Sequence, residues 1–204
     1  MTITRNLIVA GLVLLWIPGA RAAAPHVWSV TVLGPAGDPR LAAVADAIEY
    51  WNEQLTIAHA NVRLGSYTRA DLQVADDLLR SMSDGVLGSG PSASLPPQLK
   101  NAASDITIVF SGADLISVGM PPGRGHKGIA IIRRPDVPPL SLPNVARNVI
   151  AHELGHVLGL PHTSDPALLM CGRPAPCRPA VFQSETKVFF PLTHSERRLL
   201  AQVR

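Results

Sequence analysis

Hydrophobic periodicity divides the first third of the chain into a strand, a long helix and a second strand. Residues 26–33 (HVWSVTVL) alternate between apolar and polar side chains, as a half-buried strand does. Within residues 41–57, apolar side chains recur at intervals of three and four, which predicts an amphipathic helix. Asp38 is placed to cap this helix, with Pro39 at its first position. Residues 61–67 (NVRLGSY) predict the second strand.

The middle of the chain predicts two more strands separated by less regular segments. Residues 105–110 (DITIVF) are β-branched and mostly apolar, which predicts a strand in the centre of a sheet. Residues 128–132 (GIAII) form a shorter apolar run of the same kind. Residues 71–82 favour a helix, and the Gly-, Ser- and Pro-rich residues 83–97 predict a surface loop.

Two further helices are predicted near the C-terminus. One begins near Pro143, with Ser141 as its candidate cap. Thr193 and Glu196 have the spacing of a capping box, which predicts a helix over residues 197–203. Strands that alternate with helices in this way predict an α/β domain with three main helices.

The first 22 residues have the composition of an export signal. Arg5 supplies positive charge, residues 7–17 are uncharged and apolar, and residues 20–22 (ARA) offer small side chains at the cleavage positions. The apolar run is shorter than a membrane span requires, which favours removal over retention as an anchor. We therefore expect a signal peptide over residues 1–22 and a secreted or periplasmic mature domain over residues 23–204.

Charge and size restrict the classes of partner. After removal of the signal, the mature chain carries 16 basic and 15 acidic residues, which is no footprint for nucleic-acid binding. The roughly 180 residues that remain suit one domain with a single core. We expect no nucleic-acid partner, no membrane association after signal removal, and a monomer.

One stretch, AHELGHVLGLPH, carries the candidate chemistry. It spaces His152, His156 and His162 in the pattern H-E-x-x-H-x-x-G-x-x-H. Residues four apart on a helix share a face, so the first two histidines can bind one cation. Gly159 permits a left-handed turn and Pro161 prevents helical continuation, which brings the third histidine to the same place. Three neutral imidazoles with one open position are typical of a catalytic zinc site.

The same stretch resembles the metzincin zinc metalloproteases, whose second mark is a methionine turn beneath the metal. Met170 matches that methionine, and residues 162–170 (HTSDPALLM) look like the matrixin (matrix-metalloprotease-like) branch; the specific similarity covers residues 149–170. The resemblance implies a minimal, bacterial-type exported form with a zincin-like catalytic domain. This domain has a mixed twisted sheet, with zinc in a cleft and Met170 as support below the metal. It also implies that residues 128–132 are the edge strand above the cleft, although an ordinary buried strand is the alternative.

By this resemblance the chain is an exported zinc-dependent endopeptidase that binds one catalytic Zn²⁺ and an extended peptide or protein substrate. Glu153 is rotated off the metal axis, so it can act as general base on a zinc-activated water and return the proton to the leaving amine. Many family members bind a structural zinc and calcium in a later loop. Here that loop has Asp114 and His126 without companion histidines, so we expect neither ion.

The chain departs from the matrixins directly after the methionine. Cys171 and Cys177 are its only cysteines, and an oxidising compartment favours a disulfide between them. Alternatively, a free Cys171 thiolate occupies the open metal position, and the protein is an exported non-catalytic zinc-binding module. A further alternative is a zinc hydrolase in which Glu185 replaces His162 as third ligand, although the turn before that histidine argues against it.

Overall fold

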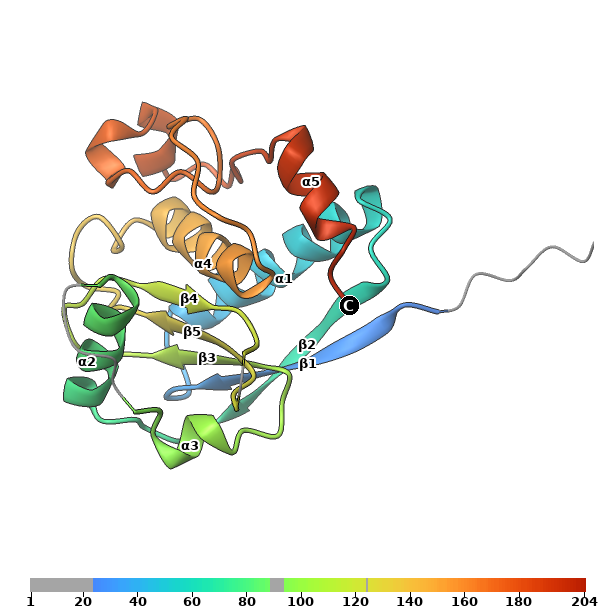
Figure 1. The fold of residues 1–204 in the computed structure, drawn as a ribbon. Coiled ribbons are helices and arrows are strands. Elements are labelled where there is room, and N and C mark those ends of the chain that lie inside the picture. Colours follow the sequence, from blue (N-terminus) through green and yellow to red (C-terminus); the bar gives the residue numbers. More distant parts are fainter. Residues whose placement is uncertain (1–23, 89–93, 124) are drawn as a thin grey trace, which may run out of the picture.

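A computed structural model describes residues 24–88, 94–123 and 125–204 (Figure 1). The predicted signal peptide lies outside the described residues. Among the residues that are described, no helix is long and apolar enough to cross a membrane.

A five-stranded mixed sheet forms the centre of the domain, in the order β2-β1-β3-β5-β4. Its strands are β1 (His26–Leu33), β2 (Val62–Ala70), β3 (Ile106–Phe110), β4 (Val118–Met120) and β5 (Gly128–Ile132). β1, β2, β3 and β5 run parallel, and β4 alone pairs antiparallel, with β5. The prediction that residues 105–110 form a central strand is confirmed, because β3 has two strands on either side of it.

The prediction that residues 128–132 form the edge strand is wrong. All five residues of β5 are buried, and β5 is hydrogen-bonded between β3 and β4. The edge strand is β4, which pairs Val118 with Ile131 and Met120 with Ile129. An uninterrupted apolar run such as GIAII suits a strand that is covered on both faces. The three residues of β4 are too few to give a periodic signal.

Helices cover both faces of the sheet. The helices α1 (Arg40–Ile57) and α4 (Pro143–Val157) pack together over one face (Figure 1). They share a core with alternate sheet residues such as Val32, Ile108 and Ile132. The helix α2 (Asp76–Val86) and the short α3 (Pro97–Lys100) contribute Leu79, Met82 and Leu99 to a second core, which contains Val109 and Ile131 of the sheet.

The last helix, α5 (His194–Leu200), begins directly after its cap Thr193, so it both starts and ends earlier than the helix predicted over residues 197–203. The Thr193 side chain accepts the N–H of Glu196, and the Glu196 carboxylate accepts the N–H of Thr193. The predicted capping box is thus confirmed. The helix predicted over residues 71–82 is displaced to α2, which begins at Asp76 and ends at Val86.

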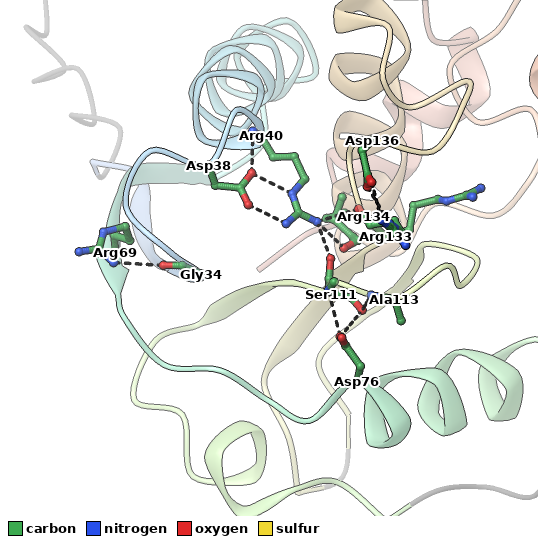
Figure 2. Close-up of polar contacts among 12 residues, drawn as sticks. Gly34, Asp38, Arg40, Arg69, Asp76, Ser111, Ala113, Arg133, Arg134 and Asp136 are labelled. Carbon is green, nitrogen blue, oxygen red and sulfur yellow. Dashed lines mark hydrogen bonds and ion pairs between the residues drawn. The ribbon is translucent and has the colours of Figure 1, made fainter.

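A buried arginine ties α1 to the carboxyl ends of the central strands (Figure 2). The Arg40 guanidinium donates to the carbonyls of Ser111, Ile132 and Arg133 and pairs with Asp38 at 2.6 Å. The Asp38 carboxylate also accepts the Arg40 backbone N–H at the start of the helix, 2.9 Å away. These contacts fix where the chain leaves β5 on its way to α4.

Candidate metal centre and cleft

Helix α4 and the turn that follows it bring the three predicted histidines together. His152 and His156 lie one turn apart on α4, and Gly159 takes the left-handed conformation that the sequence requires, with φ of 87°. The Nε2 atom of His162 lies 3.1 Å from that of His152 and 2.9 Å from that of His156. The Nε2 atoms of His152 and His156 are 3.1 Å apart.

Backbone carbonyls orient two of the rings. The Nδ1–H of His152 donates to the carbonyl of Leu169, and that of His156 donates to the carbonyl of Leu160, each at 2.8 Å. Because a carbonyl oxygen can only accept, the proton of each neutral ring is on Nδ1 and its Nε2 carries a lone pair. The Nε2 lone pairs of both rings are therefore available to a cation, and both Nε2 atoms converge with the Nε2 atom of His162.

These three nitrogen atoms fit a single tetrahedral metal ion. Zinc–nitrogen bonds of 2.0–2.1 Å separate adjacent ligand atoms by about 3.3 Å, close to the spacing here. Burial lowers the pKa of His152 to about 3 and also lowers the pKa of His156 and His162. All three rings are thus neutral near pH 7, which is the form that binds a metal. Without a cation, three converging lone pairs would repel each other.

Glu153 lies beside this cluster and not in it. Among the described residues, the only metal-ligand group of three or more consists of the three histidines. The Glu153 side chain is buried, and burial raises its pKa to about 8, while a hydrogen bond from the Gly119 N–H opposes that rise. The structure therefore places one buried carboxyl group next to the three imidazoles, as the spacing of the motif predicts.

Gly119 in β4 is a site residue that the sequence did not reveal. A Cβ atom there would lie 2.1 Å from the carbonyl oxygen of Glu153 and 2.8 Å from the Cβ of His156. Only glycine lets the edge strand approach α4 this closely. Its sequence neighbours form no recognisable motif, so no local signal distinguishes this glycine from the other glycines of the chain.

Met170 packs beneath α4, behind the histidines. It is fully buried, and a Cβ atom at Gly155 would lie 2.4 Å from its Sδ. The Met170 carbonyl accepts the Thr163 N–H at 2.9 Å, which joins the methionine turn to the chain just after His162.

Arg178 clamps that turn and was also missed. Its two terminal nitrogens donate to the carbonyls of Cys171 and Leu168, at 2.9 and 2.8 Å, on either side of Met170. The guanidinium lies over the rings of Phe182 and Phe190, 4.6 and 4.9 Å from their centroids. A surface arginine is the usual expectation for a lone arginine in a Pro-rich loop.

Two buried asparagines on α4 bind the backbone of residues 181–190, the segment that follows Arg178 in the chain. The Asn144 side chain donates to the Val181 carbonyl and accepts the Val188 N–H, both at 3.0 Å. The Asn148 side chain donates to the Val188 carbonyl at 2.8 Å and accepts the Phe190 N–H at 3.0 Å. Amides at positions i and i+4 of an otherwise apolar helix face were the available signal for this role.

The predicted disulfide is wrong in this structure, because both cysteines are free thiols. Cys171 is buried at the end of the methionine turn, where its Sγ accepts the Arg173 N–H at 3.4 Å. Cys177 is exposed at the end of a short 3-10 turn. The two side chains therefore lie in different environments. Within the described residues, neither cysteine belongs to the metal-ligand group, and Glu185 does not belong to it either.

The two residues considered for a second metal site have protein partners. Asp114 pairs with Arg133, and the His126 Nδ1 donates to the Lys127 carbonyl at 2.8 Å.

The histidines and Glu153 line a cleft of about 810 Å³. One wall is the sheet edge, with Ser117, Val118 and Gly119, and the other is the segment 171–178. Val145, Asn148 and Val149 of α4 lie between the walls. The cleft is therefore bounded by a strand edge on one side and by the cysteine-containing loop on the other.

Comparison with known proteins supports the fold. No family model matches the chain, and no curated protein matches it. Among solved structures, archaemetzincin from Methanopyrus kandleri superposes with a TM-score of 0.50 at 17% identity, over 92% of this chain and 98% of that one. The chain has an archaemetzincin-like fold. The predicted mixed α/β, zincin-like architecture is thus confirmed, while the matrixin branch stays a prediction.

Proposed function

We propose that this chain is an exported zinc-dependent endopeptidase of the matrixin-like branch. The observation that carries the proposal is the convergence of three Nε2 atoms within 3.1 Å beside a buried carboxyl group, in a cleft bounded by a sheet edge. The archaemetzincin-like fold and the matrixin-like sequence from residue 162 to residue 170 support it.

His152, His156 and His162 would hold the zinc, which would supply Lewis acidity toward a water molecule and a peptide carbonyl. Glu153 takes a proton from the attacking water and later returns it to the leaving amine. Burial raises the pKa of this carboxyl group to about 8, and a cation bound beside it would lower that pKa and favour the carboxylate that accepts the proton.

The edge strand β4 binds the substrate backbone in this proposal. β4 pairs with β5 on one side, and its residues Val118 and Gly119 line the cleft. An extended peptide that adds to this edge gains backbone hydrogen bonds with little dependence on its sequence. Gly119 also packs directly against Glu153, so the same strand contacts both the peptide and the residue that acts as general base.

The test compares wild-type protein with Glu153→Ala in digestion of casein, with zinc and with a chelator, while bound zinc is measured directly. We expect Glu153→Ala to keep one zinc per chain and to lose roughly 10²- to 10⁴-fold of the cleavage rate. The matched control is Glu185→Ala, which removes an exposed glutamate outside the cluster and should keep both zinc and activity.

Undiminished cleavage by Glu153→Ala would exclude the assigned mechanism. Loss of zinc in Glu185→Ala would favour the rival third ligand. If zinc-loaded wild-type protein cleaves nothing, the non-catalytic zinc module becomes the better description.

We further propose that the mature chain is a secreted or periplasmic monomer. The composition of residues 1–22 supports export. Mass spectrometry of the protein from the culture medium or periplasm should find an N-terminus near residue 23, and a retained residue 1 would contradict the proposal.

A further inference from the structure

The charges that line the cleft are unequal. Three of its lining residues are arginines, Arg133, Arg173 and Arg178. Among the described lining residues, Glu153 is the only acidic one, and its carboxyl group is buried. The cleft therefore carries a net positive charge, although the mature chain as a whole is close to neutral.

This positive charge is concentrated in the wall formed by residues 171–178. Arg133, on the opposite wall, is paired with Asp114. Arg178 donates to two backbone carbonyls, and no carboxylate among the described residues pairs with it. Arg173 is exposed, and within the described part of the chain its guanidinium forms no ion pair. Arg173 is thus the cation that is available to a ligand.

The backbone of Arg173 also lies close to the candidate metal centre. The preceding residue, Gly172, lies against the third histidine, since a Cβ atom there would be 3.0 Å from the Nδ1 of His162. Pro174 follows directly, and its ring restricts the backbone that carries the arginine. A long cationic side chain is therefore anchored next to the place where the proposed chemistry occurs.

We propose that the cleft selects peptides with a carboxylate close to the scissile bond, and that Arg173 binds this carboxylate. The inference rests on the proposed peptidase function. Arg178 contributes a second positive charge behind the wall, in surroundings where charge is poorly screened. The carboxylate comes from a Glu or Asp side chain or from a free C-terminus of the peptide, since both present the same group to a guanidinium.

Fluorogenic peptides with blocked ends test this specificity. Each carries a single Glu, Gln or Lys that is moved along the sequence, and one further peptide has a free C-terminal carboxylate. We expect kcat/KM to be about tenfold higher for Glu than for Gln at one position, with Lys lower still, and the preference to weaken in high salt. If only the peptide with the free C-terminus is preferred, the carboxylate that Arg173 binds is the C-terminal carboxylate and not an acidic side chain.

Charge reversal identifies the residue. In Arg173→Glu, the order of the rates (Glu, then Gln, then Lys) should reverse. The control Arg198→Glu reverses the charge of an exposed arginine on α5 and should leave that order unchanged. Equal rates for all three peptides, or a preference that survives Arg173→Glu, would overturn the inference.

A binding measurement separates this inference from the proposed function. Fluorescence anisotropy with the Glu153→Ala variant reports peptide affinity without turnover. Tighter binding of the Glu peptide that depends on Arg173, without cleavage by wild-type protein, would retain the carboxylate site and reject the peptidase. Zinc-dependent cleavage with no charge preference would do the opposite.

Discussion

Gly119 in β4 lies directly against Glu153 on α4: a Cβ atom at position 119 would be 2.1 Å from the Glu153 carbonyl oxygen, so the two segments approach too closely for any side chain there. Sheet edge and metal-binding helix are therefore one packed unit. A displacement of β4 would alter both the environment of the candidate general base and the strand that is proposed to bind the substrate.

Replacing Gly119 by alanine should destabilise the protein strongly. The new Cβ would overlap the Glu153 carbonyl oxygen, 2.1 Å away, and backbone atoms cannot move aside as a flexible side chain does. We expect a loss of about 3 kcal/mol in the free energy of unfolding, with loss of cleavage. Urea denaturation measures the first and peptide hydrolysis the second.

Gly37→Ala is the matched control for that experiment. It places alanine at a glycine with φ of 81° and no atom within 4 Å of the new Cβ. It should lose only the roughly 1–2 kcal/mol of a left-handed alanine and should keep activity. Equal destabilisation by the two variants would show that β4 and α4 are not closely packed.

Stability of the metal-free protein should depend on pH through Glu153. Burial raises the pKa of this carboxyl group from its ordinary 4.5 to about 8, so the folded state holds the proton more tightly than the unfolded state does. The contribution of Glu153 to the free energy of unfolding is fully present below pH 4.5. It decreases as the pH rises toward 8, by at most about 1.4 kcal/mol per pH unit. Glu153→Gln removes this titration.

The variant should therefore gain stability relative to wild-type protein between pH 4.5 and pH 8 when a chelator is present. Because the three histidines are the same in both proteins, their own pH dependence largely cancels in the difference. Urea unfolding of both proteins at several pH values provides the measurement. A difference that is constant with pH would contradict the burial of an ionisable Glu153.

Removing the Arg178 clamp should weaken both the fold and metal binding. Arg178→Ala deletes two charged hydrogen bonds to the carbonyls of Leu168 and Cys171, which costs about 3 kcal/mol or more. The turn that they hold contains Leu169, whose carbonyl orients His152, so zinc affinity should fall roughly 10- to 100-fold.

Arg178→Lys keeps the charge but not the planar fork, and should give intermediate losses. Competition with a chromophoric chelator measures zinc affinity independently of turnover. Arg198→Ala on α5 should change the stability by less than about 0.5 kcal/mol. Unchanged zinc affinity in Arg178→Ala would show that the clamp does not position the ligand.

The two thiols should react with a thiol reagent at very different rates. Cys177 is exposed and should react at once, while the buried Cys171 should react roughly a hundredfold more slowly or only in denaturant. Ellman titration of unreduced protein counts the thiols, and Cys177→Ser should remove the fast phase alone. If neither cysteine reacts in denaturant without a reductant, the two cysteines form a disulfide as the sequence predicted.

Much of the fold could be predicted because it depends on local patterns. The alternation over residues 26–33 and the apolar run over residues 106–110 gave β1 and β3, and the periodicity over residues 41–57 gave α1. The edge of the sheet could not be predicted in this way. Which strand lies outermost depends on pairing between distant segments, and the three residues of β4 have no pattern of their own.

The candidate site likewise has features that local sequence predicts and features that only distant contacts determine. The sequence by itself determined the three histidines, the adjacent glutamate and the left-handed turn at Gly159, because helical geometry and the special freedom of glycine act within a few residues. Only the tertiary structure decided that Gly119 contacts Glu153, that Arg178 holds the methionine turn and that Cys171 is buried while Cys177 is exposed. Such contacts join segments that are distant in the chain, and they follow from close packing in three dimensions, which no short stretch of sequence encodes.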